Sequence, residues 1–131
     1  MSKLIINGGR PLNGSVEIEG SKNSVLPILA ATVLNSGVNI IHKCPKIHDV
    51  KLMLRVLEYI GCKINNEGNT LIIDSSTANK TEIPEVFASE MRSSIIFLGP
   101  VLARFGKVTI SYPGGCVLLL ALFYTETSKL E

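Results

Sequence analysis

The sequence predicts a mixed α/β (α+β) domain in which helices pack on a β-sheet. Short β-like runs alternate with stretches of helical apolar spacing, in the order β, β, α, β, α, β, β, α, β. Of the 131 residues, 46% are hydrophobic and 18% are charged. This composition is typical of a globular chain that is long enough to bury a sizeable core as one domain.

The first elements predicted are a β-hairpin and a helix. Residues 4–6 form a β-like run, residues 15–19 alternate polar and apolar side chains, and a turn rich in glycine lies between them. Residues 24–34 carry apolar side chains at helical spacing, with Pro27 in the first turn, where its missing N–H costs little. Residues 35–37 should end this helix.

The middle of the chain is predicted to contain three strands and a second helix. The strands are residues 38–41, 62–64 and 70–73, and a turn at 65–69 joins the last two. The second helix begins at His48 or Asp49, with Asp49 interpreted as an N-cap, and it ends near Ile60 at the C-cap Gly61.

A third helix is expected to begin at Pro84 after a polar linker at 77–82. It should carry Arg92, kink or break at Gly99-Pro100, and end at Gly106. A strand at 107–111 follows and leads to a turn at 113–116.

Several classes of function are disfavoured by composition. The net charge is +2 and the basic residues are scattered, so we expect no nucleic acid partner. The longest apolar runs are too short to span a bilayer, so we expect no membrane association. Three cysteines and no secretory leader favour free thiols in a reducing cytosol. His42 and Cys44 have no further ligands nearby, so no metal site is predicted.

Lys22 and Asn23 are candidates for binding an anion. They follow Gly20-Ser21 after a predicted strand and open a helix, where backbone N–H groups attract phosphate or carboxylate. The alternative is that Ser21 or Asn23 caps the helix while Lys22 is solvated. The spacing is not that of a Walker loop.

Arg92 and Cys116 are the other two candidates. Arg92 could clamp a carboxylate or phosphate with two hydrogen bonds, or it could pair with Glu90 or Glu85. Cys116 follows two glycines in a loop, where a thiol can be an acid, a nucleophile or a structural residue. Cys44 and Cys62 are interpreted as ordinary buried or half-buried thiols.

Three segments in this order resemble the N-terminal part of the UDP-N-acetylglucosamine 1-carboxyvinyltransferase (UDP-N-acetylglucosamine enolpyruvyl transferase) family: GSKNSVLPILAATVL, MRSSIIFLGPVLARFG and PGGC. The opening LIINGGRPLNGSVEIEGSKN and Asp49-Val50 fit as well, so the resemblance covers about residues 3–116. It implies transfer of the enolpyruvyl group of phosphoenolpyruvate to the 3′-hydroxyl of UDP-N-acetylglucosamine, with release of phosphate. This reaction is the first committed step of peptidoglycan synthesis in the bacterial cytoplasm, and it uses no metal or organic cofactor.

The resemblance also implies a fold and roles for the candidate residues. The family has two similar domains, each an inside-out α/β barrel of repeated β-α-β units, with the active site between them. Residues 1–21 would belong to the other domain, and residues 22–116 would form a partial domain carrying the catalytic loop. By the same resemblance, Lys22 contacts phosphoenolpyruvate, Asn23 lies at the substrate site and Arg92 helps to hold the substrates. Cys116 would be the catalytic proton donor, which also forms a covalent adduct with phosphoenolpyruvate.

The sequence departs from the family after Cys116. The family continues towards Gly-x-Arg-Pro, whereas here an apolar run follows and Ala121 stands at the arginine position. Residues 117–131 are therefore expected to be a divergent, non-native tail, as a reading-frame slip would produce. The family is also much longer, so the 131-residue chain alone is expected to be inactive.

Two other functions are weighed against the transferase. One is a truncated, inactive fragment with at most weak anion binding. The other is an enolpyruvyl transferase acting on a shikimate ester, against which the Cys116 loop and the MRSSIIFLGPVLARFG segment argue.

Overall fold

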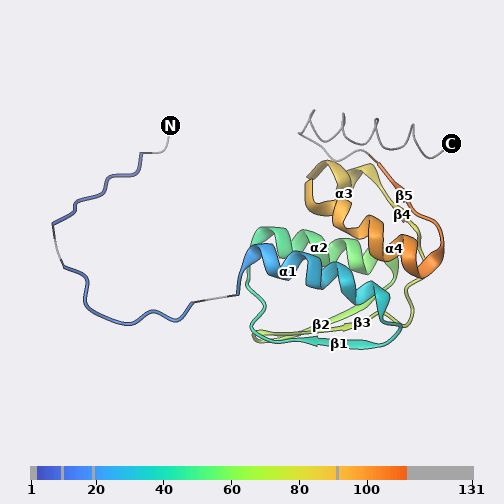
Figure 1. Ribbon diagram of the computed structural model, residues 1–131, viewed down its shortest axis with the longest axis horizontal. Helices are drawn as coiled ribbons and strands as arrows, with labels where there is room; N and C mark the ends of the chain where they lie inside the picture. Colours follow the sequence, from blue (N-terminus) through green and yellow to red (C-terminus); the bar gives the residue numbers. More distant parts are fainter. Residues whose placement is uncertain (1–2, 10, 19, 91, 112–131) are drawn as a thin grey trace.

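The computed structural model describes residues 3–9, 11–18, 20–90 and 92–111, and for Arg92 it describes the backbone. Helices and strands alternate along this part of the chain, as the predicted fold class requires (Figure 1). In chain order the elements are α1 (Lys22–Ala31), the 3₁₀ turn η1 (Thr32–Leu34), β1 (Val38–Ile41), α2 (His48–Ile60), β2 (Lys63–Glu67), β3 (Thr70–Asp74), β4 (Glu82–Ile83), α3 (Glu85–Glu90), the 3₁₀ segment η2 (Arg92–Phe97), α4 (Leu98–Phe105) and β5 (Thr109–Ile110).

The larger sheet has the order β1-β3-β2, with β3 antiparallel to both neighbours. Ile40 lies opposite Ile72, and Ile64 lies opposite Ile73. Since β1 and β2 each run against β3, they run in the same direction. The segment β1–α2–β2 is therefore a β-α-β unit into which the β2–β3 hairpin has inserted its second strand.

The core lies between this sheet and the helices. Helices α1 and α2 pack against each other and lie on one side of the sheet, and α3 and α4 lie beyond them (Figure 1). Alternate residues of β3 point into the core, where Leu71 and Ile73 join fully buried side chains of the helices. The opposite face is open, since Val38 and Ile40 of β1 are 59% and 58% exposed. Period-2 burial of this kind is what an antiparallel sheet with one covered face produces.

Helix α2 has the bounds that the sequence predicted, and Gly61 ends it. Gly61 has φ 111°, a left-handed conformation that glycine adopts without a Cβ penalty. Its N–H donates to the Glu58 carbonyl at 3.0 Å, and the Cys62 N–H donates to the Leu57 carbonyl at 2.9 Å. These two bonds form a Schellman motif, which satisfies carbonyls that the end of a helix leaves free.

The predicted third helix is interrupted earlier than expected. It consists of α3, the 3₁₀ segment η2 and α4, and the predicted break at Gly99-Pro100 is wrong. Both residues lie in the first turn of α4, where proline removes an N–H that has no intrahelical partner. The predicted linker at 77–82 is also partly structured, because β4 pairs in parallel with β5, with Ile83 opposite Ile110.

The predicted N-terminal hairpin is not formed among the described residues 3–9 and 11–18, which contain no strand. This segment extends away from the helices (Figure 1). Leu4, Ile5 and Ile6 are 79–87% exposed, so they contact no core. The prediction failed because a two-stranded hairpin without a packed face is at best marginally stable. The assignment of residues 1–21 to another domain remains a prediction.

No helix in the described part of the chain is both long and apolar enough to cross a membrane.

Candidate functional site

The candidate site is a cavity of about 510 Å³ between the first turns of α1 and α2 and the segment that joins α3 to η2. Two of the residues singled out from the sequence, Lys22 and Asn23, line it. The full lining is Lys22, Asn23, Leu26, Pro27, Asp49, Glu90, Ser93 and Ile96.

Lys22 is placed at the cavity by a close approach of the preceding backbone. A Cβ built on Gly20 would lie 2.8 Å from the Lys43 carbonyl oxygen and 3.2 Å from Cδ of Pro45, so only glycine fits there unchanged. The chain then enters α1 through Ser21, whose carbonyl accepts hydrogen bonds from the amides of Ser24 and Val25. Ser21 is the N-cap residue of α1, as one of the predicted alternatives held, but its side chain makes no capping hydrogen bond.

The Lys22 ammonium is not simply solvated, because it forms an ion pair with the Asp49 carboxylate. The Lys22 side chain is 56% exposed and that of Asp49 is 28% exposed. The interpretation of Asp49 as an N-cap is wrong: the N-cap of α2 is Ile47, and Asp49 is the second residue of the helix. A carboxylate in the first turn is still favoured there by the positive end of the helix dipole.

A second carboxylate on the cavity, Glu90, pairs with Arg55 of α2 rather than with Lys22. The Arg55 Nη1 lies 3.2 Å from the Glu90 Oε2, and the Arg55 guanidinium lies 5.4 Å from the centre of the Phe87 ring. These contacts tie the end of α3 to α2. The next segment, η2, begins at Arg92, one residue before Ser93.

Of the other two predicted site residues, the structure describes only the backbone of Arg92. The backbone of Arg92 opens η2, directly beside the cavity-lining Ser93, but its side chain lies outside the described part of the structure. Cys116 also lies outside the described residues. Their predicted roles, like those of Lys22 and Asn23, remain predictions.

The cavity combines hydrogen-bond donors with two carboxylates. Lys22, the amide of Asn23 and the hydroxyl of Ser93 can donate hydrogen bonds to an anion, and the N-terminal turns of α1 and α2 add partial positive charge. Asp49 and Glu90 offset the charge of Lys22. Within the described residues no group of three or more His, Cys, Asp or Glu side chains could hold a metal ion.

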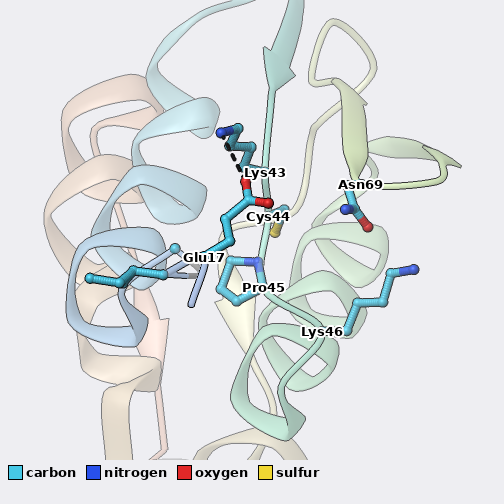
Figure 2. A pocket seen from close by; sticks show the side chains of 8 residues that line it. Glu17, Lys43, Cys44, Pro45, Lys46 and Asn69 are labelled. Atoms are coloured by element: carbon cyan, nitrogen blue, oxygen red, sulfur yellow. Dashed lines mark hydrogen bonds and ion pairs between the residues drawn. The ribbon is translucent and has the colours of Figure 1, made fainter. Parts of the chain in front are cut away.

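A second hollow of about 230 Å³ lies between the N-terminal segment and the β1–α2 connection. Figure 2 shows Glu17 turned towards Lys43, with 3.5 Å between the Lys43 Nζ and the Glu17 Oε1, while the Lys46 ammonium points away from that pair. Both paired side chains are at least 80% exposed, so the pair contributes at most about 1 kcal/mol. This hollow contains none of the predicted site residues.

Neither described cysteine is activated. Burial raises the pKa of the half-buried Cys44 thiol. Burial also raises the pKa of Cys62 to about 11, although the positive charge of Arg104 acts in the opposite direction. Cys44 is half-buried and Cys62 is buried, so their interpretation as ordinary buried or half-buried thiols is confirmed. Raised pKa values also disfavour reactivity, since reactive cysteines have lowered ones.

Comparison with known proteins defines the class. Residues 6–119 match the sequence model of the family described as EPSP synthase (3-phosphoshikimate 1-carboxyvinyltransferase), and the chain belongs to this enolpyruvyl transferase family. Within it, the chain is 50% identical over 116 residues to UDP-N-acetylglucosamine 1-carboxyvinyltransferase 2 of Caldanaerobacter subterraneus subsp. tengcongensis, covering 88% of this chain and 28% of that protein. It is 42% identical over 118 residues to UDP-N-acetylglucosamine 1-carboxyvinyltransferase of Desulfatibacillum aliphaticivorans, covering 90% of this chain and 28% of the relative.

A solved structure agrees with the sequence comparison. The crystal structure of the enolpyruvyl transferase NikO from Streptomyces tendae superposes with a TM-score of 0.65 at 26% identity, over 76% of this chain and 23% of that one. The predicted fold class and the predicted family resemblance are thereby confirmed. The chain spans about 28% of the length of the curated relatives it matches.

Three polar residues of the cavity were not identified as site residues from the sequence: Asp49, Glu90 and Ser93. Asp49 carried a signal, a carboxylate at the beginning of a predicted helix, whereas Glu90 lay in the interior of the predicted third helix and ends the observed α3. Their convergence depends on how α1, α2 and α3 pack, which no local pattern encodes.

Proposed function

We propose that this chain supplies part of the active site of a UDP-N-acetylglucosamine 1-carboxyvinyltransferase. The reaction transfers the enolpyruvyl group of phosphoenolpyruvate to the 3′-hydroxyl of UDP-N-acetylglucosamine and releases phosphate. The observation that carries the proposal is the 50% identity over 116 residues to a protein of that name. The cavity that holds Lys22 and Asn23 at the start of α1 supports it, because the substrate is anionic.

Each predicted site residue has a task in this proposal. Lys22 binds the phosphate or carboxylate of phosphoenolpyruvate, with Asn23 beside it, and Arg92 adds a guanidinium that can hold an anion by two hydrogen bonds. The Cys116 thiol gives a proton to the methylene carbon, while the 3′-hydroxyl of the sugar loses its proton to a base and its oxygen bonds to the adjacent carbon. Loss of a proton from the new methyl group then restores the double bond as phosphate leaves. No metal or organic cofactor takes part.

The cellular setting follows from the same proposal. The reaction would be the first committed step of peptidoglycan synthesis in the bacterial cytoplasm, and it would link this protein to cell-wall growth and division. Cys116 would be the residue that the epoxide fosfomycin alkylates in the assembled enzyme.

Two alternatives are distinguished by experiment. One alternative is an enzyme that uses a shikimate ester, as the description of the matching family names. The other is an inactive fragment with weak anion binding, which would fit the coverage of only 28% of the curated relative. If the nucleotide sequence after codon 116 encodes Gly-x-Arg-Pro in another frame, residues 117–131 are a product of a frame slip.

A chimera tests the substrate. Residues 3–112 replace the matching stretch of the Caldanaerobacter protein, and phosphate release from phosphoenolpyruvate is measured with UDP-N-acetylglucosamine or with 3-phosphoshikimate. We expect release with the nucleotide sugar alone, and a loss of roughly a hundredfold or more for Lys22→Ala. Lys43→Ala, in the other hollow, is the matched control and should keep full activity. A folded chimera that uses 3-phosphoshikimate, or neither acceptor, would contradict the proposal.

A further inference from the structure

The ion pair between Lys22 and Asp49 connects the two helices that begin at the cavity. Lys22 is the first residue of α1, and Asp49 is the second residue of α2. Both helices start at the same end of the molecule, where the chain enters α1 from the N-terminal segment (Figure 1). Both side chains line the cavity of the candidate site.

We propose that Asp49 is a positioning residue, which holds the Lys22 ammonium in the orientation that an anionic substrate needs. The inference rests on the proposed function, in which Lys22 binds phosphoenolpyruvate. A free lysine samples many rotamers of its four-carbon stem, and this freedom is lost when a ligand binds. An ammonium has three N–H donors, so the bond to Asp49 fixes the stem and leaves donors for the ligand.

The opposing effect is repulsion between Asp49 and the anion. Exposed charges are screened by salt, with a Debye length of about 8 Å at physiological ionic strength. A direct contact between side chains is much less sensitive to that screening. Lys22 also neutralises the charge of Asp49 by contact. The orientation of the Lys22 ammonium is therefore expected to matter more than the repulsion between Asp49 and the anion. Removing the Asp49 carboxylate should accordingly weaken the binding of an anion.

Glu90 provides a charge-matched comparison. It lines the same cavity, but its partner is Arg55, at 3.2 Å. Asp49→Asn and Glu90→Gln each remove one negative charge from the cavity, and only the first removes a contact with Lys22. If charge alone mattered, both substitutions would tighten binding of an anion.

The test is a titration of the ¹⁵N-labelled 131-residue chain with phosphoenolpyruvate, followed at the amides of Lys22 and Asn23. Asp49→Asn should weaken binding by about tenfold, a coupling typical of contacting residues, at both low and physiological salt. Asp49→Glu should restore most of the affinity, and Glu90→Gln should not weaken binding. In a Lys22→Gln background, Asp49→Asn should cause no further loss. If Asp49 only stabilised the fold, Asp49→Asn would weaken binding in the Lys22→Gln background as well.

The outcomes separate this inference from the proposed function. If the wild-type chain binds phosphoenolpyruvate, but Asp49→Asn binds it equally well or more tightly, the positioning role is wrong while the function stands. If Asp49→Asn weakens binding equally with and without Lys22, the role is also wrong. If the wild-type amides do not respond to phosphoenolpyruvate, the positioning role in this chain is wrong, while the proposed function is decided by the phosphate release of the chimera. Should Asp49→Asn not fold by its amide spectrum, Asp49→Ser, which also removes the carboxylate, gives the same comparison.

Discussion

The side chain and the backbone of Lys22 are positioned by different neighbours. Its side chain contacts Asp49, while its backbone follows Gly20, which packs against the carbonyl of Lys43. Lys43 itself has φ 54°, an uncommon conformation for a residue with a Cβ. The close approach of these two backbone segments explains why glycine is needed two residues before the candidate site residue.

Gly20→Ala should therefore destabilise the fold and displace the start of α1. Its Cβ would lie 2.8 Å from a backbone oxygen, which cannot rotate away as a side chain could. Overpacking of this kind costs about 1–3 kcal/mol of unfolding free energy, measurable by urea denaturation, and the Lys22 amide signal should shift. Gly99→Ala is the control, because nothing lies within 4 Å of its Cβ in α4, and there alanine should stabilise by about 0.5–1 kcal/mol. Equal urea midpoints for Gly20→Ala and the wild type would contradict the account.

Cys62 makes the stability of the fold depend on pH in the alkaline range. Burial raises the pKa of its thiol from 9.0 to about 11 in the folded chain. The folded state therefore binds this proton more tightly than the unfolded state does. The contribution is fully present below pH 9, is lost as the pH rises towards 11, and amounts to about 2–3 kcal/mol. Urea denaturation between pH 8 and 11 should show this loss.

The control for Cys62 is Cys62→Ala. Alanine fits the buried site but does not titrate, so its unfolding free energy should fall less over the same range. Parallel curves for the two proteins would show that other groups account for the alkaline loss.

Among the elements, α2 was predicted with correct bounds because its signals are local. Its apolar spacing, an acidic residue in the first turn and Gly61 at the end all lie within one stretch of sequence. Strand β5 lies within the predicted strand at 107–111, whereas its partner β4 is only two residues long, too short for any period to appear. The division of the third helix into α3, η2 and α4 depends on packing against α1 and α2, so Gly99-Pro100 gave a misleading signal.

The same reasoning explains how much of the candidate site could be predicted. Lys22 and Asn23 were candidates because a lysine and an asparagine open a helix after Gly20, and the family resemblance then favoured a substrate site over a helix cap. Asp49 was identified only as a helix-start residue, because its partner lies 27 positions away in the sequence and on another helix. Sequence reasoning thus finds residues at element ends, and tertiary packing decides which of those ends meet.

Helix α4 is anchored to the end of the first helical segment by Arg104. The Arg104 Nη1 donates to the Val33 carbonyl at 2.8 Å, in η1, where the carbonyls have no helical partner. A charged hydrogen bond of this kind contributes about 1.5–3 kcal/mol, so Arg104→Ala should lower the unfolding free energy by about that amount. Removing this cation should also raise the pKa of Cys62 further, since Arg104 now lowers it. Urea denaturation and the pH dependence of Cys62 alkylation measure the two effects.

The matched comparison for Arg104 is Arg55→Ala. Arg55 also carries a guanidinium that bridges two elements, but its pair with Glu90 is about half exposed, and exposed pairs contribute about 0–1 kcal/mol. A larger loss for Arg55→Ala than for Arg104→Ala would contradict this ranking.

At the scale of the whole molecule, a site made only of the described residues lacks several parts that the proposed reaction needs. The chain spans about 28% of its curated relatives, and among its described residues the cavity is bounded by α1, α2, α3 and η2 alone. The positive charge of Lys22 is offset there by Asp49 and Glu90. Further cations and a surface that excludes water must therefore come from elsewhere before phosphate transfer can be fast.

The 131-residue chain alone should therefore not release phosphate from phosphoenolpyruvate and UDP-N-acetylglucosamine at a measurable rate. Misplacement of a reacting group by about 1 Å can cost roughly a hundredfold, and here Ala121 stands at the family's arginine position and the chain spans about 28% of its curated relatives. Cys116 should react with iodoacetamide as an ordinary thiol but show no preference for fosfomycin, whereas the raised pKa values of Cys44 and Cys62 should make both react more slowly. Phosphate release and mass spectrometry after fosfomycin treatment measure both. Turnover that Cys116→Ala abolishes, or fosfomycin labelling that UDP-N-acetylglucosamine accelerates, would show instead that these 131 residues assemble a working site.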